Sequence, residues 1–114
     1  MIALFVELPP FQRYRRHYLD DDDFRLLQFV LLESPEAGDL IQHTGGLRKL
    51  RYADDRRGKG KRGGLRVIYY WWPSHRQIWL FTLYSKDEQP DLDLAQRRTL
   101  AKMLNIEIRE RQHD

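Results

Sequence analysis

Basic side chains are concentrated in one nineteen-residue segment of the chain. Residues 48–66 carry nine lysines and arginines and only two acidic residues. Residues 1–47 carry four basic and eight acidic residues, and residues 67–114 carry seven of each. The modest overall net charge of +3 therefore conceals a local excess of positive charge. Such a concentrated positive field is suited to a polyanion such as a nucleic acid.

Within this segment, the glycine-rich stretch 54–64 is expected to be an exposed loop. Its glycines would allow the backbone to approach a phosphodiester closely, and its cations would supply countercharge. Its GKGKRGG sequence lacks the spacing of a P-loop, so we expect no nucleotide binding by that route. The alternative is a loop whose charges only keep the protein in solution. The residues predicted to bind nucleic-acid phosphates are Arg48, Arg56, Arg57, Lys59, Lys61 and Arg62.

A second group of residues has the chemistry needed to cleave a phosphodiester. Arg66 opens an otherwise apolar strand, and Tyr84 and Lys86 interrupt the apolar pattern at the end of the next strand. If the two strands pair through the turn at 73–76, their distal ends meet, and Lys49 and Arg51 can join from a neighbouring strand. Cations stabilise the additional charge of a pentavalent phosphate, and a tyrosine or lysine can transfer a proton. A surface network of ion pairs would produce a similar pattern.

Other chemistries have little support in the sequence. The chain has no cysteine, which excludes disulfides, thiolate nucleophiles and cysteine-based metal sites. Its histidines, His17, His43, His75 and His113, are scattered without metal-ligand spacing, so they are expected to be surface residues. The run Asp20–Asp23 is interpreted as a helix start, because consecutive carboxylates cannot all face one ion. We therefore expect no metal and no cofactor.

The elements that must position these residues form one α+β domain over residues 1–114. We expect a small, mainly antiparallel sheet covered by helices, in the order β-α-α-β-β-β-α. Prolines 9 and 10 suit the start of a first helix, and a second ends near Ser34-Pro35. The predicted strands are 2–8, 47–52, 65–72 and 77–85, and the predicted helices begin at Pro9, near Phe24 and near Asp91 or Asp93.

Composition also bears on the compartment. No apolar run approaches the roughly 18–20 residues that a membrane span needs. The first residues place an apolar stretch before a basic cluster, which is the reverse of a secretory signal. With no cysteine in the chain, a reducing cytoplasm is the expected location.

Three sequence blocks, in this order and behind the opening FVELPPFQRYR, resemble the HigB branch of the RelE-like toxins. They are TGGLRKLRYA, GKGKRGGLRVIYYWW and LFTLYSKDEQPDL. The resemblance covers essentially the whole chain. It implies a compact α+β fold of the microbial-RNase type and a ribosome-dependent endoribonuclease that cuts mRNA without metal. It also implies a helix-turn-helix antitoxin partner of the HigA type, with operator DNA contacted only through the toxin–antitoxin complex.

Carried over by position, Arg66 matches the family arginine that steadies the scissile phosphate. Lys49 and Arg51 match a basic pair one strand earlier, and Lys86 matches a basic position at the end of the last strand. RelE itself has a further tyrosine toward its C-terminus, whereas no tyrosine follows Tyr84 here. The general base is therefore open among Tyr84, Lys86 and Lys49. The alternative functions are a non-enzymatic gyrase poison of the ParE type and a plain nucleic-acid-binding module.

Overall fold

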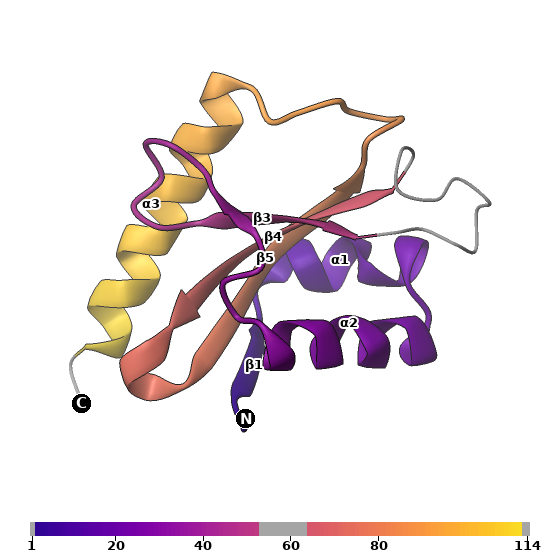
Figure 1. Ribbon diagram of the computed structural model, residues 1–114. Coiled ribbons are helices and arrows are strands. Elements are labelled where there is room, and N and C mark those ends of the chain that lie inside the picture. Colours follow the sequence, from indigo (N-terminus) through magenta and orange to yellow (C-terminus); the bar gives the residue numbers. More distant parts are fainter. Residues whose placement is uncertain (1, 53–63, 113–114) are drawn as a thin grey trace.

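A five-stranded sheet with the strand order β1-β5-β4-β3-β2 forms the centre of the molecule (Figure 1). The computed structural model describes residues 2–52 and 64–112. Its strands are β1 (Leu4–Glu7), β2 (Asp39–Leu40), β3 (Arg48–Tyr52), β4 (Leu65–Trp72) and β5 (Gln77–Ser85). Its helices are α1 (Pro9–Tyr18), α2 (Asp21–Glu33) and α3 (Leu94–Arg111). The predicted α+β class is confirmed.

The sheet differs from the sequence prediction at its two edges. β1 is shorter than the predicted strand 2–8 and runs parallel to β5, while the other pairs are antiparallel. β2 is an additional strand of two residues, which pair with Arg48 and Lys49 of β3. Two residues are too few to show an alternating pattern, so the sequence alone does not indicate this strand. It is defined by its pairing with β3.

Helix starts follow the local chemistry of the sequence. Pro9 and Pro10 occupy the first positions of α1, where their missing N–H groups would have no intrahelical partner. Asp20 caps α2, because its carboxylate accepts a hydrogen bond of 2.8 Å from the Asp23 N–H. The other aspartates of the run lie in the first turn, where negative charge favours the helix dipole. The interpretation of Asp20–Asp23 as a helix start is confirmed.

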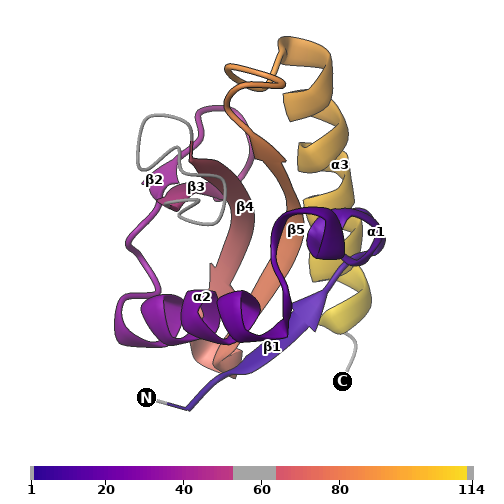
Figure 2. The same ribbon diagram turned by 90° about the vertical axis from the view of Figure 1, so that its right-hand side faces the viewer.

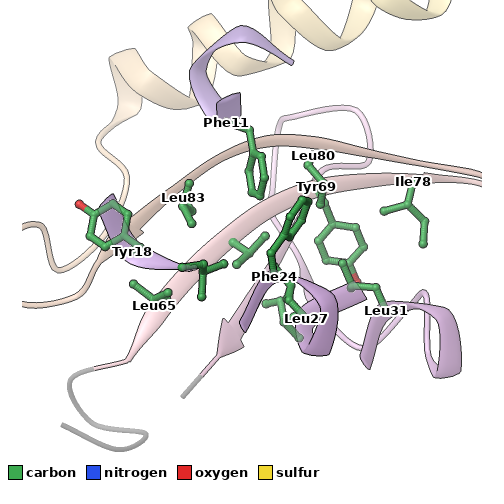
Figure 3. Packing of buried hydrophobic residues seen from close by; sticks show 13 residues of the cluster. Phe11, Tyr18, Phe24, Leu27, Leu31, Leu65, Tyr69, Ile78, Leu80 and Leu83 are labelled. Atoms are coloured by element: carbon green, nitrogen blue, oxygen red, sulfur yellow. The ribbon is translucent and has the colours of Figure 1, made fainter. Parts of the chain in front are cut away.

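Helices cover both faces of the sheet (Figures 1 and 2). α1 and α2 pack on one face, and Figure 3 shows their side chains against those of β4 and β5. The labelled residues of this core are Phe11, Tyr18, Phe24, Leu27, Leu31, Leu65, Tyr69, Ile78, Leu80 and Leu83. α3 packs on the opposite face through Leu100 and Leu104, against Ile68, Trp79 and Phe81. The two closely packed cores hold the central strands in place, so a charged side chain on these strands has a fixed position.

The β4–β5 hairpin contains one irregularity. Its turn is a short 3₁₀ helix, Pro73–His75, followed by Arg76 in the left-handed region at φ 51°. Tyr69 pairs with Leu80, whereas the preceding residue, Ile68, pairs with Thr82. Phe81 is therefore the extra residue of a β-bulge, and every pair beyond it is shifted by one position.

No helix among the described residues is long and apolar enough to cross a membrane.

Candidate functional site

Arg66 lies between two other candidate residues on the face of the sheet that α3 covers. It pairs with Arg51 of β3 on one side and with Tyr84 of β5 on the other. Directly opposite residues in a sheet point to the same face, so the three side chains share one surface. The structure thus brings together the strand ends that the hairpin prediction placed side by side.

The β-bulge determines that Tyr84 belongs to this surface. In an unbroken strand, Tyr84 would alternate with Phe81 and point to the face of α1 and α2. The extra residue reverses the alternation, so that Tyr84 and Phe81 both contribute to the core under α3. Arg66 consequently faces a phenol instead of Leu83.

The Arg66 guanidinium is buried but weakly bonded. The residue is 6% exposed, and its Nη1 atom lies 3.5 Å from the Gly64 carbonyl oxygen and 3.3 Å from that of Leu65. It forms no ion pair with any residue in the described ranges 2–52 and 64–112. A buried cation is costly unless it is paired, so this site favours the arrival of an anion.

Tyr84 is also buried, and its hydroxyl oxygen has no hydrogen-bond partner within the described part of the chain. Burial and, to a smaller extent, the Asp91 carboxylate raise the pKa of Tyr84 to about 12, although Arg66 and Arg97 oppose the shift. A phenol with this pKa stays protonated at neutral pH. Tyr84 can therefore donate a proton or a hydrogen bond, and it is poorly suited to act as a base.

Lys49 and Arg97 are linked through one carboxylate. Asp91 lies in the segment between β5 and α3, and its side-chain oxygens are 3.5 Å from Lys49 Nζ and 3.3 Å from Arg97 Nη2. The Asp91 Oδ1 atom also accepts a hydrogen bond of 2.8 Å from the Leu92 N–H. Burial raises the pKa of Asp91, but this N–H and the two cations outweigh it, so the pKa lies below its usual value.

Two clefts open on either side of Leu92. The first encloses about 170 Å³ and is lined by Asp39, Leu40, Ile41, Gln42, Lys49, Asp91, Leu92 and Arg97. The second encloses about 250 Å³ and is lined by Tyr14, Tyr18, Thr82, Leu83, Tyr84, Gln89, Leu92 and Gln96. Lys49 and Tyr84 thus line neighbouring hollows, which share Leu92 as a wall.

The remaining predicted residues are not gathered at this surface. Lys86 is exposed just after β5, and its backbone N–H donates to the Gly64 oxygen at 3.2 Å, beside the start of Arg66's strand. Arg48 lies on the other face of β3, where its guanidinium donates to the carbonyl oxygens of Glu36 at 3.2 Å and Gly38 at 2.8 Å. The predicted loop cations, Arg56, Arg57, Lys59, Lys61 and Arg62, lie outside the described residues.

The histidines within the described ranges lie on three separate segments: α1, the connection between β2 and β3, and the hairpin turn. His17 and His43 are exposed, and His75 stacks on Trp72 in the hairpin turn with ring centroids 3.7 Å apart. Among the described residues, no three histidine or acidic side chains are grouped so that they would hold a metal ion.

Sequence reasoning missed Asp91 and Arg97 as parts of this site. Arg97 stands at the start of α3, where a positive charge is disfavoured by the helix dipole. Its unusual position is the signal that marks it out. The sequence indicates Asp91 only as a possible helix cap, a role that belongs to Asp93, whose carboxylate accepts the Gln96 N–H at 2.8 Å.

Comparison with known proteins bears on the fold. The sequence matches no protein-family model. A solved structure of a double mutant of the Escherichia coli toxin RelE in the free state is similar, with a TM-score of 0.55 and 14% sequence identity over 79% of this chain and 90% of that chain. The chain has a RelE-like fold. A chain of the intact E. coli RelBE toxin–antitoxin complex is also similar to this one. The two have a TM-score of 0.51 and 14% sequence identity, over 72% of this chain and 94% of that chain.

Proposed function

We propose that this protein is a ribosome-dependent mRNA endoribonuclease, the toxin of a type II toxin–antitoxin pair of the HigB branch. The observation that carries the proposal is the buried Arg66 cation, which forms no ion pair within residues 2–52 and 64–112, placed opposite the protonated phenol of Tyr84. The RelE-like fold and the sequence blocks around Arg66 and Tyr84 support the same assignment.

In the proposed reaction, the 2′-hydroxyl of the RNA attacks the adjacent phosphorus in line with the scissile bond. Arg66 stabilises the charge that develops on the non-bridging oxygens, with Lys49 and Arg51 on the same face to hold the phosphate. A base removes the 2′-hydroxyl proton, and the bond to the 5′-oxygen breaks. The products are a 2′,3′-cyclic phosphate and a 5′-hydroxyl.

The pKa of Tyr84 favours different residues for the two proton transfers, one to the leaving 5′-oxygen and one from the 2′-hydroxyl. Because Tyr84 is protonated at neutral pH, it is the proposed donor to the leaving 5′-oxygen. The proposed base is then Lys86, exposed just after β5 beside the start of β4, or Lys49 on the α3 face of β3. The reaction as proposed requires no metal or other cofactor. The cations at 56–62 remain predicted contacts to ribosomal RNA.

An antitoxin partner is part of this proposal. The E. coli RelE chain is found in a complex with its antitoxin, and a helix-turn-helix protein of the HigA type is the proposed counterpart here. An adjacent open reading frame for such a protein is expected, and operator DNA would be contacted through the complex. The absence of such a reading frame would count against the assignment.

The direct test is cleavage of mRNA on purified ribosomes, with primer extension to map the cuts. Arg66→Gln is expected to lower the cleavage rate about 100-fold, the scale of losing one transition-state donor. Arg98→Gln removes the same charge from an exposed position of α3 and is the matched control. Cleavage by Arg66→Gln at the rate of Arg98→Gln would refute the role of Arg66.

A second measurement addresses the activity as a whole. After induction without antitoxin, mRNA fragmentation and DNA supercoiling are followed in the same cells. Fragmented mRNA with normal supercoiling is expected. Intact mRNA with inhibited gyrase would instead identify a gyrase poison, and salt-sensitive RNA binding without cleavage on ribosomes would identify a binding module.

A further inference from the structure

Lys49 and Arg97 reach the same point from two elements distant in sequence. Lys49 lies on β3 and Arg97 on the first turn of α3, and both contact the Asp91 carboxylate. The Lys49 and Arg97 side chains are 19% and 32% exposed, whereas that of Asp91 is 50% exposed. Two largely enclosed cations thus converge on one anion that is still open to solvent.

The contacts of Asp91 with the two cations are loose. Charge-assisted N–H···O bonds usually measure about 2.7–2.9 Å, while these two measure 3.5 Å and 3.3 Å. The tightest bond of the carboxylate is instead the 2.8 Å bond from the Leu92 N–H, within its own turn. An ion pair with one exposed member contributes little to stability, so displacing Asp91 costs little.

Arg97 has donor capacity that Asp91 does not use. Its Nε atom is buried and has no hydrogen-bond partner within the described residues. A planar guanidinium can bind two oxygens of a phosphate side by side, through Nε and a terminal nitrogen. Asp91 engages only the terminal Nη2 atom. The geometry therefore suits a phosphate better than the carboxylate that now stands there.

We propose that Arg97, together with Lys49 shared between the two phosphates, forms a second phosphate-binding site, which takes an RNA phosphate adjacent to the scissile one, and that Asp91 occupies this site in the free protein. The inference rests on the proposed function, since it takes RNA as the ligand. Lys49 lies two residues from Arg51, which pairs with Arg66, and the clefts lined by Arg97 and by Tyr84 share Leu92, so the second site adjoins the cleavage site. Asp91 is then an internal competitor that RNA displaces.

One other carboxylate lines the cleft and must be separated from Asp91. Asp39 stands opposite Lys49 in the register of β2 and β3. It belongs to an exposed strand, and it does not bridge the two cations. A general field of negative charge would involve Asp39 and Asp91 alike, whereas occupation of the phosphate site involves Asp91 alone.

The test is binding of a labelled single-stranded RNA with 2′-O-methyl riboses, which removes the attacking hydroxyl. Asp91→Asn keeps an acceptor for the Leu92 N–H but loses the charge, and it is expected to bind about 3- to 10-fold more tightly than wild type. Glu107→Gln changes the net charge equally at a distant ion pair, with Arg111 at 3.2 Å, and is the control. Asp39→Asn is expected to give the smaller gain.

A second arm leaves Asp91 unchanged. Arg97→Gln is expected to weaken binding at least 3-fold relative to Arg98→Gln, its exposed neighbour on α3. In the double variant Asp91→Asn/Arg97→Gln, the gain from Asp91→Asn should disappear, since the two changes act on one site. A thermal unfolding curve for each variant establishes that the comparison is between folded proteins.

Each outcome bears on one proposal at a time. Equal gains from Asp91→Asn, Asp39→Asn and Glu107→Gln would overturn the second phosphate site, as would equal binding by Arg97→Gln and Arg98→Gln. Because the RNA cannot be cleaved, these results do not depend on catalysis. The expected binding pattern without cleavage on ribosomes would overturn the proposed function and leave the phosphate site standing.

Discussion

Arg66 of β4 stands directly opposite Tyr84 of β5, and a single extra residue in β5 makes this so. Without the bulge at Phe81, the register of the hairpin turn would place Leu83 there. The pair combines a buried guanidinium with a buried hydroxyl that has no partner within the described residues. A buried guanidinium held by weak hydrogen bonds and a buried hydroxyl without a described partner both lower stability, and their retention side by side is typical of a functional site.

Tyr84→Phe is expected to leave stability at pH 8 unchanged or to increase it by up to about 1 kcal/mol. The substitution removes a buried hydroxyl that makes no hydrogen bond to any described residue, and it leaves the ring in place. Chemical denaturation at pH 8 provides the measurement. A loss of more than about 1 kcal/mol would mean that the hydroxyl has a stabilising partner.

The same variant changes the response to alkaline pH. Burial disfavours the phenolate and raises the folded-state pKa of Tyr84 to about 12 from its ordinary 10, so Tyr84 adds no pH-dependent cost below pH 10, and folding loses stability as the pH rises from 10 toward 12. By pH 11, wild type should lose about 1.4 kcal/mol more than Tyr84→Phe, a value that follows from one pKa unit. Tyr69, whose pKa is also raised, is present in both proteins and cancels. Parallel losses in the two proteins would contradict the pKa shift.

Tyr69→Phe should destabilise the protein by about 1–3 kcal/mol, since it leaves a buried amide without an acceptor. The Tyr69 hydroxyl donates to the Pro35 oxygen at 2.7 Å and accepts from the Gly38 N–H at 2.9 Å. These bonds tie the segment before β2 to β4. Tyr70→Phe, one residue along the strand, is the control and should cost less. Equal costs would show that the two bonds contribute nothing.

Arg48→Gln and Arg51→Gln should separate stability from RNA affinity. Arg48 holds the carbonyl oxygens of Glu36 and Gly38 on the α2 face, so its loss should cost about 1 kcal/mol of stability. Arg51 is exposed beside Arg66, so its loss should weaken RNA binding more than the loss of Arg48 does. Urea denaturation and binding of the 2′-O-methyl RNA measure the two effects. The reverse order in RNA affinity would favour Arg48 as the RNA contact.

Asp93→Ala should destabilise the protein by about 1 kcal/mol through loss of a helix cap. The Asp93 carboxylate accepts the Gln96 N–H at 2.8 Å, and the Gln96 side chain accepts the Asp93 N–H at 2.9 Å. Asp93→Asn keeps the acceptor and should remain close to wild type. Equal losses in thermal denaturation would point to the charge of Asp93 and not to its hydrogen bond.

Much of the fold was predictable because its determinants are local. The predicted bounds of strands 65–72 and 77–85 are those of the structure. Both segments are rich in β-branched and aromatic residues, and Gly64 and the turn at 73–76 mark where they begin and end. The helix starts at Pro9 and after Asp20 likewise follow from proline geometry and side-chain capping. Each of these signals acts within a few residues, so a single sequence contains it.

The site also combines features that local sequence determines with features that depend on tertiary packing. The sequence by itself determined that cations and a tyrosine would stand at the joined ends of the β4–β5 hairpin, because residue types and strand alternation require only neighbouring positions. Only the tertiary structure decided that a bulge turns Tyr84 toward Arg66, that Arg48 faces α2, and that Asp91, which also contacts Arg97, meets Lys49 from 42 residues away in the chain. These arrangements depend on how the two cores pack on the sheet, and packing between distant segments has no local signature.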